Sequence, residues 1–512
     1  MTRIIGAQVF NSSTRAFAAR DVLVDGDRIT DVVSPRRAHC EMPESARLVV
    51  DATGRYLVPG FVDAHFHLLA LALRRLRCNL SAADGADDVY HRIREFATRG
   101  EGAVVGVEWD ESRWAKPDVP TRAGLDAVST SRPVLVRRIC CHVGVANRVL
   151  LDRLTAPARC VDRESGRIVE QAVAEATRLT APRPERIQAA VEPAIGELHA
   201  LGITGIHDIV EGANFDAWLG GLCGSRLPLR VDALLHVAFE HYDHYADRIA
   251  TAATPGAAAS TADRPAPAHP LIHVRGIKMF SDGSLGAHTA ALCAPYADRD
   301  TTGELLLEPD ALRETLVACA RRERVCAVHA IGDRAIAVVA KAMRDAREQS
   351  GGHPAFRIEH AELPGPSQLD EIEAAGAALV MQPNFVRNWA AEGGLYQTRL
   401  GRRRWLTNNP FRAVMDRNIP LAFSSDGMPP GPLFGMGGAT GHPVAAHALS
   451  PGEALGAYTA GAWGLPGHRQ RAGKIEGGMA ADLVLLAGNP LDGAASPRVE
   501  AVWVAGKAVF PG

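Results

Sequence analysis

The sequence predicts an α/β fold in three parts: a (β/α)8 TIM barrel, a small β-sandwich domain built from both chain ends, and an α/β insert after the first barrel strand. Three observations lead to this prediction. Apolar strand-like runs alternate with helical segments along the middle of the chain, both chain ends alternate polar and apolar residues, and the first two runs stand far apart. Strands that alternate with helices indicate a parallel sheet, and eight such units are the number found in a closed barrel.

Both chain ends carry the pattern of short strands. Residues 21–33 alternate polar and apolar side chains around a turn at Asp25-Gly26, and residues 499–510 have the pattern of a hairpin. Alternation with a period of two indicates half-buried strands, and an Asp-Gly pair favours a tight hairpin turn. We therefore expect residues 1–57 and 430–512 to form one composite β-domain, with the C-terminal barrel helix at the start of its second part.

The barrel is predicted over residues 58–429. Its strand-like runs are short and apolar, and most are followed by a segment of helical composition, which is typical of repeated βα units. The eight runs are residues 57–65, 202–209, 229–237, 273–280, 324–329, 356–360, 378–382 and 420–424.

The long interval between the first two runs is too large for a loop. It contains strand-like stretches of its own at residues 102–107 and 133–138, so we expect an inserted α/β subdomain over residues 75–185. Residues 252–270 are rich in Ala, Pro and Thr. Such a composition favours a surface loop.

Composition and charge limit the partners. The 512 residues include 56 Lys and Arg against 58 Asp and Glu, a net charge of −2. This balance gives no electrostatic reason to expect a nucleic acid or an anionic membrane. A small-molecule substrate is the expected partner, and a homodimer is the default assembly because homodimers are the commonest oligomers.

Several absences in the sequence favour a cytoplasmic location. No apolar run is long enough to span a bilayer, and the N-terminus lacks the pattern of a signal peptide. The nine cysteines are scattered and odd in number. This usage is typical of free thiols in a reducing compartment.

The first candidate metal-ligating residues are His65 and His67, which stand two positions apart at the end of the first strand run. In a strand such residues point to the same side, so both imidazoles can reach one metal ion. Neutral imidazole is a common zinc ligand. A His-x-His pair alone is weak evidence, because histidines at strand ends are often structural.

Four further candidates come from other strands of the predicted barrel. Lys278 lies in the fourth run, His329 and His360 end the fifth and sixth, and Asp426 follows the eighth. The carboxyl ends of barrel strands converge on one mouth, where barrel enzymes place their chemistry. Six metal-ligating or titratable side chains at such positions are hard to explain by packing, so the sequence predicts a metal centre.

These residues and their surroundings resemble the amidohydrolase superfamily, and in particular its YtcJ-like group. The resemblance covers nearly the whole chain and implies the barrel, the composite β-domain and a small α/β insert special to this group. The matching stretches are PGFVDAHFH at 59–67, GITGIHD at 202–208, KMFSDGSLG at 278–286, HAIGDRA at 329–335, RIEHAEL at 357–363, MQPNF at 381–385, SSDGM at 424–428 and GKIEGGMAADLVLL at 473–486.

The resemblance implies a role for each candidate. His65 and His67 would bind the more buried of two metals and His329 and His360 the second, while Asp426 would touch the first metal and the bridging water. A metal of this kind turns bound water into a hydroxide nucleophile near neutral pH. Asp426 would take a proton from that water and pass it to the leaving nitrogen. One or two divalent ions are expected, with zinc as first choice and manganese, iron or cobalt also compatible with the ligands.

Lys278 corresponds to the carboxylated lysine of the superfamily. A protonated ammonium is a cation and cannot ligate another cation. Burial beside a metal favours the neutral amine. That amine can add CO2 and become a carbamate, whose two oxygens and negative charge suit the bridge between two ions.

Four residues are expected near the substrate. The resemblance places His142 and Trp109 of the insert toward the active site, where His142 would bind the substrate carbonyl or its oxyanion. Asp282 would shape the pocket floor, and His207 would line the mouth or support a ligand from behind. The group usually has a Ser-Arg pair where this chain has Ala287-His288. Any substrate contact made by that arginine is therefore absent here.

The function predicted from the sequence is hydrolysis of a C–N bond other than a peptide bond, in an N-acyl, N-formyl or cyclic amide. Deamination, decarboxylation, and lactone or ester hydrolysis are alternatives on the same fold. Deaminases tend to use one metal without a carboxylated lysine, so Lys278 argues against that alternative. A catalytically inactive barrel that serves as a binding protein would have lost at least one ligand, and none is lost here.

Overall fold

The computed structural model describes residues 1–35, 48–111, 114, 118–138, 143–252, 271–428, 430–468, 471–493 and 497–511. The chain divides into two compact units, and each is described by itself. The first unit consists of Met1–Leu68, Ile195–Phe215 and Ser225–Gly512. The second consists of Leu69–Ala194 and Asp216–Gly224. The domain boundaries predicted above stay predictions.

The first unit contains the predicted barrel. Eight strands form one sheet in the order β18-β17-β16-β15-β14-β13-β12-β6, and all neighbouring pairs are parallel. Most of their residues are buried, as in a parallel sheet covered on both faces. The strands are β6 (Phe61–Phe66), β12 (Ile203–Glu211), β13 (Arg230–His236), β14 (Ile272–Phe280), β15 (Val325–Ala330), β16 (Phe356–His360), β17 (Ala378–Met381) and β18 (Leu421–Phe423).

Hydrogen bonds at the end of β18 bring the last barrel strand back to the first. The backbone N–H of Ser425 donates to Asp63 Oδ1 at 3.0 Å, and that of Asp426 donates to the carbonyl of His65 at 3.1 Å. Asp63 and His65 both belong to β6. The sheet is therefore nearly closed, and the predicted barrel is confirmed.

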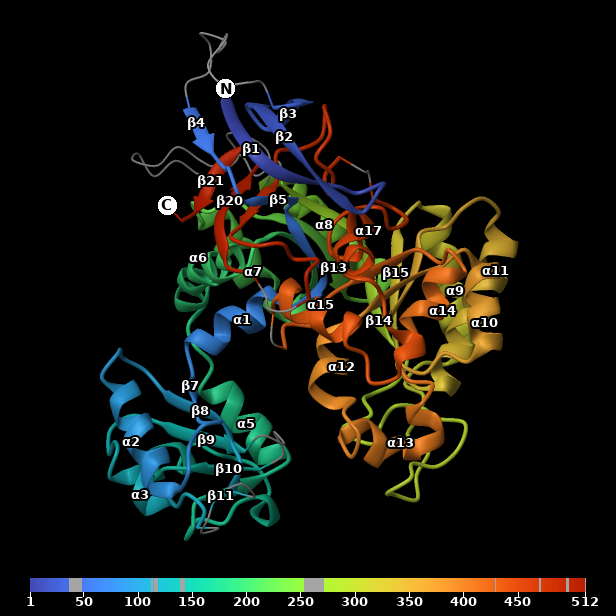
Figure 1. Cartoon of the computed structure of the whole chain (residues 1–512). Coiled ribbons are helices and arrows are strands. Elements are labelled where there is room, and N and C mark those ends of the chain that lie inside the picture. The colour runs from blue at the N-terminus through green and yellow to red at the C-terminus, as the bar shows by residue number, and fades with distance from the viewer. Residues whose placement is uncertain are drawn as a thin grey trace. The chain divides into compact units, whose positions relative to one another are not determined.

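Helices follow most barrel strands, and α9, α10 and α11 lie next to one another (Figure 1). In α10, buried residues recur at three- and four-residue intervals, from Ala335 and Ile336 to Val339 and Met343. This spacing makes one apolar stripe. The helices of the first unit are α8 (Tyr242–Ala252), α9 (Pro309–Arg321), α10 (Asp333–Ser350), α11 (Pro366–Ala375), α12 (Pro383–Trp389), α13 (Leu395–Trp405), α14 (Phe411–Asp416), α15 (Pro432–Thr440), α16 (Pro451–Ala457) and α17 (Ala460–Trp463). By residue number α1 (Leu68–Arg75) and α7 (Phe215–Gly224) belong almost entirely to the second unit, and α6 (Pro184–Ala200) is divided between the two.

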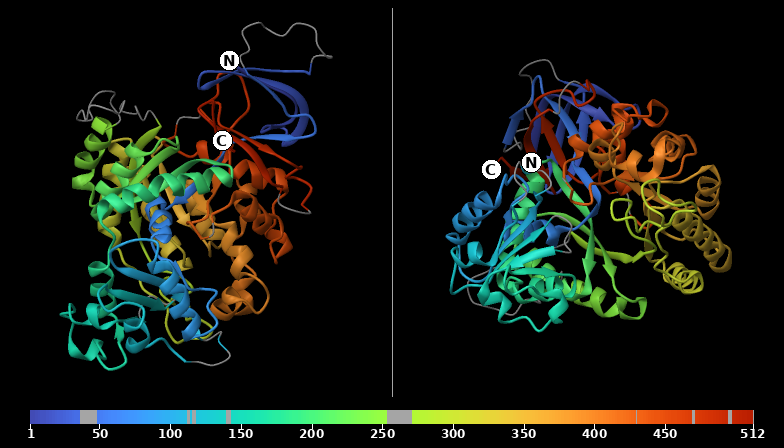
Figure 2. Two further views of the ribbon diagram at one scale, coloured as in Figure 1. Left: turned by 90° about the vertical axis from the view of Figure 1, so that its left-hand side faces the viewer. Right: turned by 90° about the horizontal axis from the view of Figure 1, so that it is seen from below.

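Both chain ends contribute to one mixed sheet, which confirms the predicted composite β-domain. Strands from the N-terminus (blue) and the C-terminus (red) lie side by side in Figures 1 and 2. Ile4, Val22, Leu57, Leu485 and Trp503 pack together in its core. The sheet has the order β21-β20-β19-β5-β1-β2-β3, with β4 paired to β1, and its strands are β1 (Thr2–Asn11), β2 (Ala16–Asp25), β3 (Arg28–Val33), β4 (Leu48–Asp51), β5 (Tyr56–Pro59), β19 (Leu483–Leu486), β20 (Val499–Val504) and β21 (Lys507–Phe510).

The predicted run 57–65 is not one strand but parts of two. Tyr56–Pro59 pairs with β19 in the mixed sheet, whereas Phe61–Phe66 pairs with β12 in the barrel. Pro59 has no N–H to continue a ladder, and the N–H of Gly60 donates to the carbonyl of Asp482 at 2.8 Å. A Cβ at Gly60 would lie 2.1 Å from Thr204 Oγ1. The chain therefore crosses between the sheets at a position that only glycine fits.

The second unit is the predicted α/β insert. Its sheet has the order β11-β10-β9-β8-β7. Val104, Val134 and Val136 face one apolar core, and Val105 and Leu135 face another. Alternate residues are thus buried on both faces of the sheet. The elements are β7 (Cys78–Asn79), α2 (Ala86–Ala97), β8 (Val104–Trp109), α3 (Arg122–Asp126), β9 (Val134–Arg138), β10 (Val143–Ala146), α4 (Arg148–Leu151), β11 (Arg167–Val169) and α5 (Gln171–Leu179).

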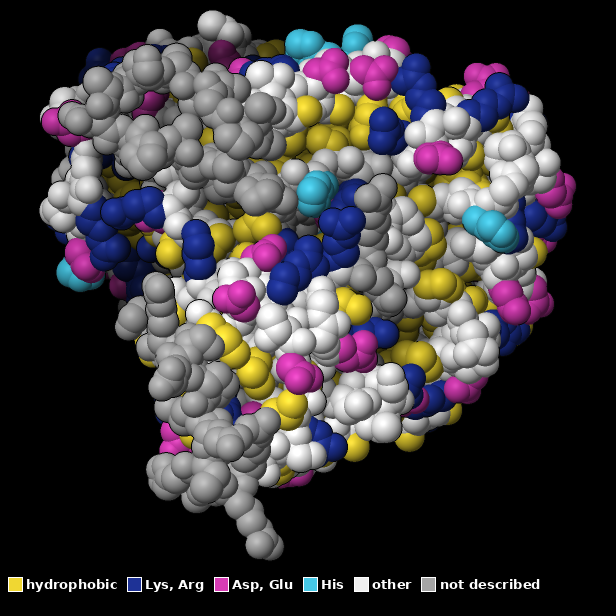
Figure 3. Space-filling view, turned by 90° about the horizontal axis from the view of Figure 1, so that it is seen from above, with side chains coloured by type: hydrophobic (Ala, Val, Ile, Leu, Met, Phe, Trp, Pro, Cys, Tyr) yellow, Lys and Arg dark blue, Asp and Glu magenta, His cyan; other side chains and the backbone are white. Residues whose placement is uncertain are grey.

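The structure bears only in part on several other expectations. Within the described ranges, no helix is long and apolar enough to cross a membrane. The six cysteines described are free thiols. On the face drawn in Figure 3, basic and acidic side chains are interspersed. The predicted loop at 252–270 lies outside the described residues except for its first residue, and the cytoplasmic location and the homodimer stay predictions.

The pairing of β14 with β15 yields a prediction for stability. Gly276 pairs with Val325, and a Cβ at Gly276 would lie 1.7 Å from the Val325 carbonyl oxygen. Backbone atoms cannot yield as a side chain can, so Gly276→Ala should destabilise the first unit by about 3 kcal/mol or more. Urea unfolding followed by circular dichroism measures the change. Gly286→Ala is the matched control, because the nearest atom to its Cβ is Leu395 Cδ2 at 3.8 Å. Equal midpoints for the two variants would contradict the prediction.

Candidate metal centre

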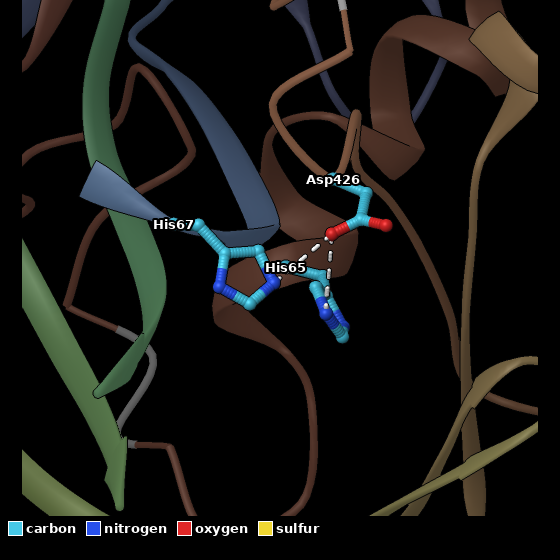
Figure 4. A group of neighbouring side chains, drawn as sticks. All are labelled: His65, His67 and Asp426. Atoms are coloured by element: carbon cyan, nitrogen blue, oxygen red, sulfur yellow. Dashed lines mark ion pairs between the residues drawn. The ribbon is translucent and has the colours of Figure 1, made fainter. Parts of the chain in front are cut away.

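His65, His67 and Asp426 converge at the carboxyl end of β6 (Figure 4). The Nε2 atoms of His65 and His67 lie 3.6 Å and 3.1 Å from Asp426 Oδ1. One potential ligand atom from each residue lies within 4.8 Å of the others. The two histidines point to one side, as their spacing of two predicts. This triangle is small enough to hold one metal ion.

Asp426 lies in a strained turn that is held in place partly by the buried carboxylate of Asp63. Asp426 has φ 54°, a left-handed conformation that non-glycine residues adopt at a cost. The turn is held from β6, because the Ser425 hydroxyl donates a short hydrogen bond to Asp63 Oδ2. It is also held from α12, where Asn384 Nδ2 donates to the carbonyl of Ser425 at 2.8 Å. Burial raises the pKa of Asp63 to about 7, although these hydrogen bonds act in the opposite direction.

The rings of His329 and His360 lie beside the triangle. Their ring centroids are 4.4 Å apart, and that of His360 is 4.9 Å from the ring of His65. His360 has φ 74°. Since Glu359, directly before it, faces His65, simple alternation would turn His360 away from the barrel axis. The positive φ brings its ring back to the same group.

The rings of His329 and His360 are each held through one nitrogen. His329 Nε2 donates to the carbonyl of Gly283 at 3.0 Å, and His360 Nδ1 donates to Gln382 Oε1 at 2.9 Å. The Nδ1 atom of His329 is buried and has no hydrogen-bond partner among the described residues. Buried polar nitrogens are rarely left unpaired. A metal ligand role would satisfy this one.

Lys278 is buried in the same region. Its Nζ lies 3.7 Å from the centroid of the Phe280 ring and 3.3 Å from the Met279 carbonyl oxygen. Burial lowers the pKa of Lys278 to about 7, although Glu359 and Asp426 act in the opposite direction. The charge of Lys278 in turn affects the pKa values of all five other predicted ligands. The structure thus brings the six residues into one neighbourhood.

The protonation states fit a divalent metal. Burial lowers the pKa values of His65, His329 and His360 well below their usual value. These rings are therefore neutral, as metal ligation requires. Burial alone would raise the pKa of Asp426, but His67 and the neighbouring positive charges lower it. Burial alone would lower the pKa of His67, but the Asp426 carboxylate outweighs this effect, so the pKa is raised. Three neutral imidazoles, an ionised carboxylate and an amine with a pKa of about 7 form a donor set that suits zinc.

A chain of buried polar groups supports His65 from behind. Glu359 Oε2 accepts a hydrogen bond from His65 Nδ1 at 2.5 Å, and Glu359 Oε1 accepts one from Arg357 Nε at 2.5 Å. Arg357 also donates to the Ala64 carbonyl at 2.7 Å and to His207 Nδ1 at 3.0 Å. The hydrogen bond on Nδ1 of His65 leaves Nε2 to face Asp426, which sets the tautomer needed for ligation.

His207 is the last member of this series of hydrogen-bonded groups and does not line the barrel mouth. It is fully buried, and its ring stacks on that of His468 at 4.3 Å. His468 Nδ1 donates to Asp232 Oδ2 at 2.6 Å, so three potential metal ligands stand together here as well. However, Arg357 occupies Nδ1 of His207, and Arg275 forms an ion pair with Asp232 at 2.9 Å. Two guanidinium cations at this position make it a hydrogen-bonded support rather than a second cation site.

The other predicted substrate contacts lie in different surroundings. Asp282 accepts hydrogen bonds from the N–H groups of Ala291, Ile331 and Gly332. It therefore ties loops together and stands 3.4 Å from His329 Nε2. Trp109 is buried in the second unit against Trp114. His142 lies outside the described residues. The substrate roles of all three stay predictions.

Sequence reasoning missed Arg357, Glu359 and Asp63 as supports of the ligands. Each stands on a strand next to a predicted ligand, and Glu359 and Arg357 are two positions apart, the spacing that puts two side chains on one face. Charged residues inside an apolar strand were the signal that could have found them. His236, which ends β13, was missed too.

The chain is similar to known proteins over most of its length. A family model described as the amidohydrolase family matches residues 48–510. The chain is 27% identical to the putative amidohydrolase YtcJ of Bacillus subtilis over 478 residues, covering 86% of this chain and 85% of that protein. It is 25% identical over 530 residues to an N-substituted formamide deformylase of Arthrobacter pascens, covering 96% and 94%. An uncharacterized metal-dependent hydrolase from Pyrococcus furiosus superposes with a TM-score of 0.77 at 25% identity, over 96% of this chain and all of that one.

The support behind His65 yields a prediction for metal affinity. Glu359→Gln keeps the size of the side chain but removes the charge that His65 and Arg357 share. Removal of such a partner should weaken zinc binding about 10- to 100-fold. Competition with a fluorescent chelator measures the affinity. Glu373→Gln, an exposed change on α11, is the control and should bind as the native chain does. Native affinity in a folded Glu359→Gln variant would refute the role.

Proposed function

Because the chain belongs to the amidohydrolase family, we propose that it is a zinc-dependent hydrolase that cleaves a C–N bond other than a peptide bond. Its substrate would be a small N-formyl, N-acyl or cyclic amide. The observation that carries the proposal is the convergence of His65 and His67 on the Asp426 carboxylate, beside the unpaired nitrogen of His329. The name of the formamide deformylase from Arthrobacter pascens favours formamides as the first substrates to test.

The residues divide into ligands of two ions. His65, His67 and Asp426 would hold one, and His329 and His360 the other. When bound, such ions supply an acidic water as nucleophile and a Lewis acid for the substrate carbonyl. Zinc suits the mixture of imidazole and carboxylate donors.

Lys278 would bridge the two ions as a carbamate. A pKa of about 7 leaves a substantial share of the amine neutral at physiological pH. The lone pair on Nζ attacks the carbon of CO2, a C–N bond forms, and the nitrogen loses a proton to water. The product carries one negative charge on two oxygens, so an anion takes the place of the neutral amine beside the metal positions.

Asp426 would carry the proton during hydrolysis. Its pKa is low, so it begins as a carboxylate able to accept the proton of the attacking water. The strained turn at Asp426 directs its carboxylate toward His65 and His67 rather than into solvent. After the water oxygen bonds to the carbonyl carbon, Asp426 delivers the proton to the nitrogen, and the C–N bond breaks to release an amine and a carboxylic acid.

One prediction of the proposed function concerns the reaction itself. The zinc-loaded protein should hydrolyse para-nitroformanilide, whose yellow product is followed by absorbance. Asp426→Asn removes the proton carrier and should lower kcat/KM by about 10³-fold. Asp416→Asn, an exposed change in α14, is the control. No turnover of para-nitroformanilide, para-nitroacetanilide or a cyclic imide by the loaded native protein would reject amide hydrolysis. Native activity in Asp426→Asn would reject the role of Asp426.

The second prediction tests the carbamate. Purified in the presence of bicarbonate, the native chain should hold about two zinc ions, and Lys278→Ala about one or none. Elemental analysis measures both. Added propionate should restore part of the metal to Lys278→Ala, because a short carboxylate can replace the missing bridge. Lys341→Ala, on the surface of α10, should keep the native content. Full metal content in Lys278→Ala without any added acid would exclude a bridging role.

A further inference from the structure

His236 ends the third barrel strand and has no role so far. It is the last residue of β13, and Asp232 and Leu234 stand four and two positions before it. Alternation puts all three on one face of the strand. Asp232 on that face binds His468, and Leu234 packs with Ile209, Val325 and Ala327 of other barrel strands. The same face at the carboxyl end of β13 is the barrel mouth, so His236 points there.

His236 lies beside the predicted metal ligands. Leu235 pairs with Ile277, and the next residues along the two strands are His236 and Lys278. The ring of His236 meets the ring of Phe280 edge to face at 4.8 Å. Phe280 also contacts Lys278 Nζ and lies 5.4 Å from the ring of His329. His236 is therefore a neighbour of the predicted carbamate and of the second metal position.

His236 differs in two ways from the predicted ligands His65, His329 and His360. It is exposed, and no hydrogen bond to either of its ring nitrogens is found among the described residues. His65, His329 and His360 are each held through one nitrogen by another group. A ring held from behind suits a metal, whereas an unheld ring with free nitrogens is available to a transient ligand.

The charge state of His236 fits a neutral hydrogen-bond donor. Partial burial of the ring lowers its pKa, and the charges of Lys278 and His67 lower it further, while Glu211 acts in the opposite direction. The neutral imidazole carries one N–H and adds no positive charge beside the metal positions.

We propose that His236 is a catalytic residue that donates its N–H to the carbonyl oxygen of the substrate. This inference rests on the proposed function and adds a group from the barrel itself to it. When water attacks, the new C–O bond forms as the electron pair of the carbonyl moves onto its oxygen. His236 stabilises that negative oxygen by a hydrogen bond and transfers no proton. When the C–N bond breaks, the pair returns to form the carbonyl of the acid.

The test compares three variants in the zinc-loaded full chain with para-nitroformanilide. His236→Ala should lower kcat/KM by about 10²-fold, the usual effect of losing one oxyanion donor. Zinc content should stay native. His236→Gln and His236→Asn place an amide N–H near the positions of Nε2 and Nδ1, and one of them should recover activity to within about 10-fold of native. His353→Ala is the control, because it removes an exposed histidine that precedes β16 at the opposite end of the barrel strands.

A binding measurement separates this inference from the proposed reaction. Acetohydroxamate carries a carbonyl oxygen and binds metals without being hydrolysed. Calorimetry with the zinc-loaded chain should give a Kd that rises about 10-fold in His236→Ala and stays native in His353→Ala. This result would support His236 even if no amide were hydrolysed.

Two outcomes would overturn the inference alone, and a third would overturn it together with the proposed reaction. One is native activity and native acetohydroxamate affinity in His236→Ala. The other is loss of zinc in His236→Ala in proportion to the loss of activity, since His236 would then act on the metal site rather than on the substrate. Absence of both turnover and acetohydroxamate binding in the loaded native chain would remove the reaction and the inference together.

Discussion

The buried ion pair of Arg357 and Glu359 is the interaction on which the centre depends. Both side chains are excluded from water, so each charge is tolerable only while its partner remains. Loss of one partner from a buried pair typically costs about 3–5 kcal/mol. Arg357 extends from β16 to the Ala64 carbonyl on β6 and to His207 on β12. The Arg357 guanidinium thus links β16 to β6 and β12. The Glu359 carboxylate, which neutralises this guanidinium, also orients His65.

Barrel closure and ligand placement use the same residues. Asp63 and His65 alternate along β6, and both face inward. Asp63 binds Ser425, and Asp426 follows directly with its N–H on the carbonyl of His65. The join between the first and last strands therefore brings Asp426 to the two histidines. A change that opened the barrel at this seam would separate Asp426 from His65 and His67, the residues proposed to hold one metal ion together.

The sequence predicts the eight-stranded parallel barrel, the composite β-domain and the insert because periodicity and spacing are local signals. The pairing of His65 with His67 follows from strand geometry alone. Other features depend on tertiary contacts. His360 turns inward only through a positive φ, and nothing in Arg-Ile-Glu-His announces that turn. The change of sheet at Gly60 depends on Thr204, far away in sequence. The burial of His207 depends on its contacts with Arg357 and His468, and no spacing in the sequence predicts those contacts.

The histidines of the barrel can be separated by what holds their second nitrogen. Glu359, Gln382 and Gly283 hold three of the four rings predicted to bind metal, and rigid rings suit an ion whose coordination angles change little. A carbonyl oxygen moves as its carbon becomes tetrahedral, and a donor with rotational freedom can follow it. His236 has that freedom, because it is exposed and no hydrogen bond from the described residues holds its ring nitrogens. The absence of a support behind His236 is therefore consistent with a role toward the substrate, whereas the same absence behind His65 would weaken the centre.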